Sequence, residues 1–151
     1  MSEYIYLSSD VELPTGSIGD KGLNLNKATF YLSLNSLEFF FFEKNYDPDE
    51  KEKFSFSKHF SDKKYQVASI DLNLPEENQK NLSKRNKKAL QELLNYIENH
   101  FENTNATYIE ILFSLNSQEN KPLKKHNYID YNNLSINDLY YDDHKFLTVK
   151  T

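Results

Sequence analysis

The sequence predicts an α+β fold, with a mainly antiparallel sheet and one long amphipathic helix packed on one face of it. Residues 83–103 repeat apolar side chains at three- and four-residue steps, which is the period of a single helix face. Short aromatic and β-branched runs lie on both sides of this segment, and residues 107–115 are the most strand-like of them. No internal repeat or long linker divides the 151 residues, so we expect a single domain over residues 1–151.

The strands of the N-terminal half are predicted from short aromatic or β-branched runs. These runs cover residues 4–8, 28–34, 37–43 and 65–72, and the second could equally form a short helix. Residues 13–27 are polar and hold all three glycines of the chain, so we expect a long loop there. The remaining two segments, 45–49 and 54–60, are expected to form a turn and, in part, a half-buried strand.

The predicted helix has recognisable signals at both ends. Ser83 can cap its start by accepting a hydrogen bond from a backbone N–H two or three residues later, and the polar residues 103–105 end it. Its apolar side chains are expected to pack against a sheet made of residues 4–8, 65–72 and 107–115. The helix residues expected to be buried there are Leu90, Leu94, Ile97 and Phe101.

The C-terminal tail is predicted to contain short elements only. Residues 128–131 and 146–149 are candidate strands, and residues 136–141 could form one helical turn.

The composition limits the function classes that this chain can belong to. Because it contains no cysteine, it has no disulfide, no zinc–thiolate site and no thiol nucleophile. Its net charge of −5 should repel nucleic acid and anionic membranes and attract a basic partner. The longest purely apolar run is Phe39–Phe42, and the first residues lack the pattern of a secretion signal, so we expect a cytoplasmic protein.

The glycine-containing segment does not match the known phosphate-binding patterns. A P-loop needs Gly-Lys followed by a hydroxyl side chain, whereas here Lys21 precedes Gly22 and Leu23 follows it. The spacing Gly-x-x-Gly-x-x-Gly also differs from the dinucleotide-binding pattern. A turn-rich loop and a contact with a ligand or partner both remain open for residues 13–22, and we expect no cofactor.

The four histidines show no spacing typical of a metal site. His144 follows Asp142 and Asp143 directly, but these residues lie in a hydrophilic tail, so we expect no metal there. His100 lies near the end of the predicted helix, where the helix dipole favours a cation, and a structural role explains it. An enzyme that uses His59 or His144 with a nearby carboxylate is the alternative to a binding function.

The candidate partner-binding residues are acidic and aromatic, and most lie in residues 130–143, which contain no Lys or Arg. Carboxylates steer a basic partner at long range, and tyrosines offer rigid contact area. In this hypothesis Asp142 and Asp143 pair with Lys or Arg of the partner, while Tyr140 and Tyr141 supply buried contact. The alternative is an acidic surface whose tyrosines complete the core. The candidates are Tyr46, Asp47, Asp49, Asp130, Tyr131, Asp138, Tyr140, Tyr141, Asp142 and Asp143.

Five short segments carry a resemblance to a group of known proteins. They are residues 4–9, 13–19, 42–47, 56–60 and 65–67. In these segments the chain resembles small cytoplasmic proteins of low-GC Gram-positive bacteria, and in size, acidity and aromatic content it is similar to the immunity proteins that neutralise polymorphic toxins. The resemblance implies a non-catalytic module that neutralises a basic toxin. It supplies no catalytic motif, and a structural or self-assembling protein is the third hypothesis.

Overall fold

The computed structural model describes residues 2–19, 22–25, 38–44, 57–61, 65–71 and 73–151. These residues form an α+β fold with one sheet, one α-helix and two short 3-10 helices. The elements in chain order are β1 (Glu3–Ser9), β2 (Gly16–Gly19), β3 (Gly22–Leu25), β4 (Glu38–Lys44), β5 (Gln66–Ile70), α1 (Lys84–Asn103), β6 (Tyr108–Leu115), β7 (Lys125–Asp130), η1 (Tyr131–Asn133), η2 (Ile136–Asp138) and β8 (Lys145–Lys150).

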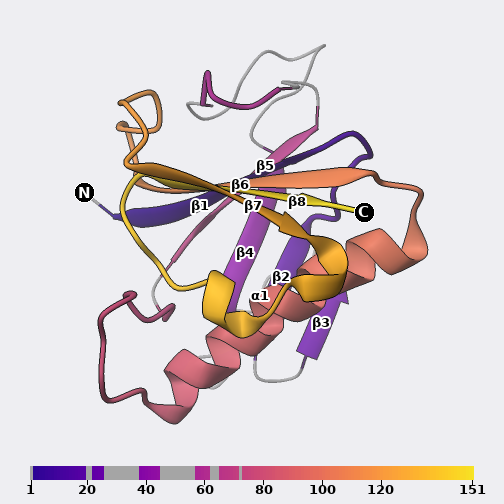
Figure 1. The fold of residues 1–151 in the computed structure, drawn as a ribbon. Helices are drawn as coiled ribbons and strands as arrows, with labels where there is room; N and C mark the ends of the chain where they lie inside the picture. Colours follow the sequence, from indigo (N-terminus) through magenta and orange to yellow (C-terminus); the bar gives the residue numbers. More distant parts are fainter. Residues whose placement is uncertain (1, 20–21, 26–37, 45–56, 62–64, 72) are drawn as a thin grey trace.

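The sheet has eight strands in the order β3-β2-β4-β5-β1-β6-β8-β7. β1 lies between β5 and β6 and is antiparallel to both, which confirms that the three predicted strands belong to one antiparallel sheet. Neighbouring strands are antiparallel throughout, except that β7 runs parallel to β8 at one edge. Figure 1 shows that β4, β2 and β3 run steeply away from the other strands, so the sheet is strongly twisted.

Alternating residues of the central strands contribute to two separate groups of buried side chains. Ile5 and Leu7 of β1 belong to the larger core, together with the apolar side chains of α1. Tyr6, between them in sequence, belongs to a smaller core with Phe60 and Phe146. The two groups correspond to the two faces of the sheet, because successive side chains of a strand point in opposite directions.

The helix α1 begins and is buried much as its sequence predicts. The hydroxyl of Ser83 accepts a hydrogen bond from the backbone N–H of Asn86 at 3.0 Å, which confirms the predicted cap. Leu90, Leu93 and Ile97 are fully buried. Leu94, which was predicted to be buried, is only partly buried, because the buried stripe is rotated toward Leu93.

The predicted loop over residues 13–27 is confirmed at residues 13–15, which belong to neither a helix nor a strand. At residues 16–19 and 22–25 the prediction is wrong, because they form β2 and β3, which pair as an antiparallel hairpin and extend the sheet beyond β4. Residues 28–34 and 45–49 lie outside the described residues, and only residues 57–60 of the predicted strand at 54–60 are described; they form a turn.

The predicted strands at residues 128–131 and 146–149 correspond to β7 and β8, and the predicted helical turn corresponds to η2. Among the described helices, none is both long and apolar enough to cross a membrane.

Candidate functional site

The acidic and aromatic residues of the tail do not form one continuous surface. Asp130 lies at the end of β7, whereas Asp142 and Asp143 come just before β8, whose first residue is paired with Lys125 at the start of β7. Because β7 and β8 are parallel, the two groups lie at opposite ends of the strands, about 16 Å apart at 3.3 Å per residue. The other predicted group, Tyr46, Asp47 and Asp49, lies outside the described residues.

The group at the end of β7 is joined to the end of α1. The ring of Tyr131 packs on Phe101 with centroids 4.6 Å apart, and its hydroxyl donates a hydrogen bond to Glu102 at 3.2 Å. Burial, together with the charges of Glu102 and Glu98, raises the pKa of Tyr131 to about 12. Asp130 is exposed beside it. Much of the Tyr131 ring is thus used for packing within the chain.

Two of the predicted contact residues are used inside the molecule. Tyr141 is only 3% exposed and meets Phe113 edge to face at 5.9 Å, so the prediction that it supplies surface contact area is wrong. The carboxylate of Asp138 accepts the backbone N–H of Ser135 and closes the turn at η2. Tyr140 is half-buried against the larger core. The positions of Tyr140 and Tyr141 therefore agree better with the alternative hypothesis, in which the tyrosines of the tail complete the core.

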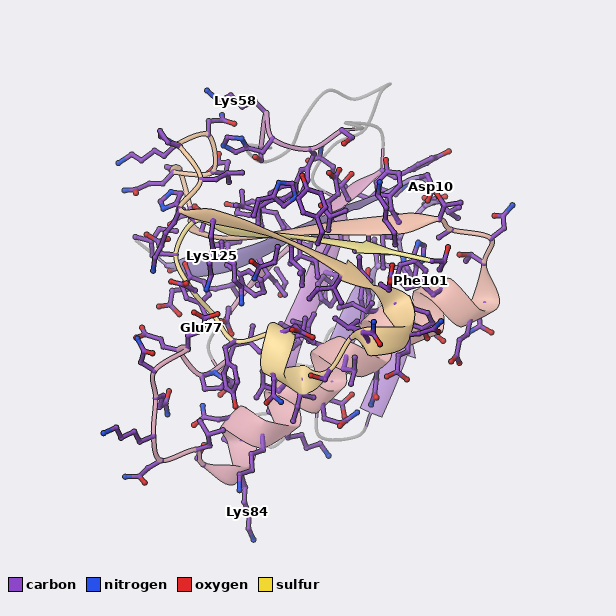
Figure 2. The ribbon with its side chains drawn as sticks, in the orientation of Figure 1. Asp10, Lys58, Glu77, Lys84, Phe101 and Lys125 are labelled. Atoms are coloured by element: carbon purple, nitrogen blue, oxygen red, sulfur yellow. The ribbon has the colours of Figure 1, made fainter. Side chains whose placement is uncertain are left out.

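Asp142 already has basic partners within this chain. Its carboxylate oxygens lie 2.7 Å from the ammonium of Lys124 and 3.3 Å from that of Lys125. The ammonium of Lys125 also lies 2.8 Å from the carboxylate of Glu77, and the ammonium of the buried Lys145 lies 3.6 Å from that Glu77 carboxylate. In Figure 2, Lys125 and Glu77 lie on one side of the molecule, far from Phe101. The sequence had suggested that Asp142 pairs with a basic residue of another protein, but its carboxylate is already paired with Lys124 and Lys125 of this chain.

Beside this network lies a cavity of about 320 Å³, which we call the acidic cavity. It is bordered by Glu3 from the start of β1, by Glu76 and Glu77 from the segment before α1, by Asp142 and Asp143, and by one lysine, Lys124. Tyr141 lies in its wall, and the Tyr141 hydroxyl donates a hydrogen bond to Asp143 at 3.3 Å. The side chain of Asp143 remains 46% exposed. The cavity therefore collects carboxylates from three separate parts of the chain.

The carboxylates that line the acidic cavity outnumber the one lysine in its lining, Lys124. Lysines approach Glu77 and Asp142, but the described residues offer no lysine or arginine ion pair to Glu3, Glu76 or Asp143. Burial raises the pKa of Glu3, and the charges of Glu76 and Asp143 raise it further. Burial likewise raises the pKa of the nearby Asp71 to about 7, against the hydrogen bonds from Leu74 and Asn73. A cation placed in this cavity would relieve the repulsion.

The histidines proposed for catalysis are held by other groups. The Nδ1 atom of His144 lies 3.2 Å from Asp143, which meets the distance expected of a histidine–carboxylate pair, but its Nε2 atom lies 3.1 Å from the carbonyl of Gln118. The Nε2 atom of His59 lies 2.9 Å from the carbonyl of Lys121. A carbonyl only accepts, so each Nε2 carries the proton and donates it. The His144–Asp143 pair therefore presents no ring nitrogen to a substrate.

His100 joins the helix α1 to the strand β1 inside the protein. It is fully buried, and its Nε2 atom lies 2.9 Å from the hydroxyl of Ser9, which is buried too. Burial lowers the pKa of His100, although the charge of Asp10 partly opposes this effect. Burial therefore works against the charged form that the expected interaction with the helix dipole requires, although His100 does lie in the last turn of α1.

A second cavity, of about 350 Å³, lies between residues 12–15 and the end of α1. It includes Leu13 and Pro14 from the beginning of the glycine-containing segment, and the carbonyl of Pro14 accepts the hydroxyl of Tyr96. Its lining has fewer ionisable groups than that of the acidic cavity, namely Glu12 and His100. No group of three or more metal-ligating side chains is found in the described parts of the chain.

The sequence patterns did not single out Glu3, Glu76 and Glu77 as candidate site residues. They lie more than sixty positions from Asp143, and no local pattern links these segments. The link comes from the fold: the backbone N–H of Glu77 donates to the carbonyl of Tyr141 at 3.2 Å, and Tyr141 donates to the carbonyl of Pro75 at 2.9 Å. Comparisons with protein-family models, with curated proteins and with solved structures find no match to this chain.

Proposed function

We propose that this protein binds a basic protein partner and does not act as a catalyst, with the acidic cavity receiving a lysine or arginine side chain of the partner. The observation that carries the proposal is the set of carboxylates from Glu3, Glu76 and Asp143 around a cavity of about 320 Å³. A guanidinium or ammonium group can donate hydrogen bonds to these carboxylate oxygens.

The charge of the whole molecule supports the same partner. A net charge of −5 steers a basic protein toward the surface, and it does so most strongly at low salt. At the cavity, an incoming cation would meet a Glu3 carboxyl whose pKa is raised by burial and by its neighbours. Pairing would favour the ionised form of Glu3, so binding and the ionisation of Glu3 should be coupled.

The arrangement of the histidines favours binding over catalysis. The histidine–carboxylate pair that the alternative requires is present at His144 and Asp143, but the other ring nitrogen of His144 faces the carbonyl of Gln118. Asp143 accepts a hydrogen bond from the Tyr141 hydroxyl at 3.3 Å beside the cavity, as expected for a pre-organised binding group.

The specific form of the proposal is an immunity protein that neutralises a basic toxin in the cytoplasm. Toxins that attack nucleic acid are basic, so an acidic inhibitor can exploit charge complementarity and fast association. The proposal also takes α1 to cover one face of the sheet. The helix side chains share a core with Ile5 and Leu7, and the ring of Tyr96 stacks on Phe42 at 4.1 Å.

A titration with a tetralysine peptide tests the cavity directly, with chemical shifts followed for each backbone amide. We expect the largest changes at Glu3, Glu76 and Asp143, and we expect the double variant E3Q/D143N to lose them. The control E98Q/E102Q removes the same charge from α1 and should keep them. Equal weakening in both double variants, or no change near the cavity, would rule out the cavity as the cation site.

A further inference from the structure

A line of six polar or charged side chains runs along the outer face of α1, on the side away from the sheet. At 3.6 residues per turn, alternating steps of four and three residues keep one direction along a helix. None of the six is buried, whereas Leu93, on the opposite side of the helix, is fully buried. Figure 2 shows Lys84, the first of them, pointing away from the rest of the molecule. We call this line the polar stripe: Lys84, Lys88, Gln91, Asn95, Glu98 and Glu102.

The charges of the polar stripe do not favour α1 as a helix of a single chain. Lys84 and Lys88 lie toward its start and Glu98 and Glu102 toward its end, so the helix dipole disfavours both groups. Each group is also a pair of like charges at a four-residue spacing, and such pairs destabilise a helix. The pattern therefore calls for a compensating interaction outside the helix itself.

The chain compensates for these charges only in part. The Tyr131 hydroxyl donates a hydrogen bond to Glu102 at 3.2 Å. Burial raises the pKa of Glu92, and the charge of Lys88 partly opposes this effect. In the parts of the chain that the structure describes, the four charged members of the polar stripe form no ion pair. They therefore remain available to a second molecule.

The polar stripe is complementary to itself when its direction is reversed. Three pairs of its residues lie at equal distances on either side of Leu93: Lys84 with Glu102, Lys88 with Glu98, and Gln91 with Asn95. The alternation of four- and three-residue steps averages 3.5 residues, the spacing at which two helices remain in contact along their length. The amide of Gln91 donates to Asn95 within the chain at 2.9 Å, so the centre of the stripe is ordered.

We propose that two copies of this chain associate through α1, with the helices antiparallel, the polar stripes in contact and a two-fold axis at the level of Leu93. Lys84 is then level with Glu102 of the partner subunit, and Lys88 is level with Glu98 of the partner subunit. Because the axis is two-fold, each pair is made twice, which gives four ion pairs. The carboxylates of each copy also lie beside the start of the other helix, where the dipole favours negative charge.

Other arrangements of the same two faces lose these pairs. Parallel helices place lysine against lysine and glutamate against glutamate. Antiparallel helices shifted by four residues, about one turn, keep either Lys84 with Glu98 or Lys88 with Glu102, but not both kinds of pair. In the first of these shifts Lys80 is level with Glu102, but Lys80 precedes the helix. Charge complementarity therefore selects both the second copy and the axis at Leu93.

The remaining basic residues near the start of α1 do not alter this choice. Lys87 lies beside the polar stripe and adds positive charge at the end that receives the partner's carboxylates. Arg85 is turned elsewhere, because its Nε atom donates to Asn73 at 3.2 Å and its guanidinium lies 4.7 Å from the centre of the Phe39 ring. Since exposed ion pairs contribute little each and the stripe has no apolar centre, we expect a weak, reversible dimer.

Charge reversal tests the association and the choice of partner together. K84E/K88E makes all four charges of the polar stripe negative, and E98K/E102K makes them all positive, so neither variant should associate with itself. Mixed in equal amounts, they restore every lysine–glutamate pair with the ends exchanged and should form a one-to-one dimer. The control K58E/K121E changes the net charge as K84E/K88E does, at exposed positions outside α1. In Figure 2, Lys58 and Lys84 lie on opposite sides of the sheet.

Sedimentation equilibrium between about 10 µM and 1 mM covers the range expected of a small interface. Salt of about 0.1 M gives a Debye length of about 10 Å, which screens the repulsion between two net charges of −5 more than it screens adjacent pairs. We expect reversible dimers for the natural chain and for K58E/K121E. The association constant should fall about tenfold or more in each of the other two variants alone, with circular dichroism showing that both are folded.

Carbodiimide coupling, which joins a lysine to a carboxylate without a spacer, tests the register. Lys84 and Glu102 of one chain are about 27 Å apart along α1, so a link between them can form only between two copies. We expect mass spectrometry of the covalent dimer to identify this link and the link of Lys88 to Glu98. The proposal is overturned if the natural chain stays monomeric, if the mixed variants associate no more than each alone, or if the covalent dimer contains neither link.

Discussion

Ser9 of β1 and His100 of α1 form a side-chain hydrogen bond of 2.9 Å between two residues that are fully buried. The bond joins the centre of the sheet to the last turns of the helix, ninety-one positions apart in sequence. Within the described structure, the Nδ1 atom of His100 has no hydrogen-bond partner, so Nε2 makes the one polar contact of this ring that the structure shows.

Removing the hydroxyl of Ser9 should therefore destabilise the protein more than the small size of that group suggests. Ser9→Ala leaves the imidazole of His100 buried without a partner and also removes the oxygen that accepts the backbone N–H of Val11. Leaving such groups unpaired costs about 1–3 kcal/mol. Urea unfolding of this variant measures the loss, with Ser2→Ala at an exposed position as the control. Equal stability of the two variants would mean that the bond contributes nothing.

The lowered pKa of His100 predicts a loss of stability in mild acid. The unfolded chain binds a proton near the ordinary pKa of about 6.5, while the folded chain binds it only at lower pH. The contribution is thus complete above about pH 6.5 and declines as the pH falls toward the lower folded pKa. Unfolding free energies between pH 7.5 and 5 should decline more for the natural chain than for His100→Gln, and parallel curves would contradict this.

Asp71 should have the opposite dependence on pH. Its folded pKa of about 7 lies above the ordinary value of 3.8, so the folded chain holds a proton that the unfolded chain has lost. This effect lowers the free energy of unfolding as the pH rises from about 4 to 7, by at most about 1.4 kcal/mol per pH unit. Relative to the natural chain, Asp71→Asn should gain stability over that interval and then level off. A constant difference between the two would contradict the raised pKa.

The rotated stripe of α1 predicts unequal costs for two adjacent leucines. Leu93 is fully buried, so Leu93→Ala should lower the free energy of unfolding by about 2–5 kcal/mol. Leu94 is only partly buried, so Leu94→Ala should lower it clearly less. Urea unfolding of the two variants makes the comparison at identical chemistry. A larger loss for Leu94→Ala would place the helix in a different rotation from the one described.

The helix and the central strands could be predicted because their patterns are local. Apolar residues at helical spacing identify α1, and Ser83 marks its first turn. The hairpin of β2 and β3 could not be recognised, since it contains all three glycines, and glycine is typical of turns and depleted in strands. The parallel pairing of β7 with β8 depends on the path of residues 131–144 between them, which no local pattern encodes.

The candidate site was only partly predictable for the same reason. Asp143 could be singled out as an exposed carboxylate in an acidic tail, but its companions Glu3 and Glu76 come from distant segments. Tyr140 and Tyr141 look alike in sequence, yet backbone hydrogen bonds of Tyr141 to residues 75 and 77 turn it into the core. Burial of this kind is decided by tertiary contacts rather than by residue type.

The most direct test of the proposed function is the association rate of the physiological partner at several salt concentrations. Capture from the native host supplies the partner, and the rate is then measured for the natural chain, for E3Q/D143N and for E98Q/E102Q. We expect a basic partner whose association slows steeply with salt, is weakened by E3Q/D143N, and is much less affected by the control. An acidic partner, or a rate indifferent to salt and to E3Q/D143N, would contradict the account.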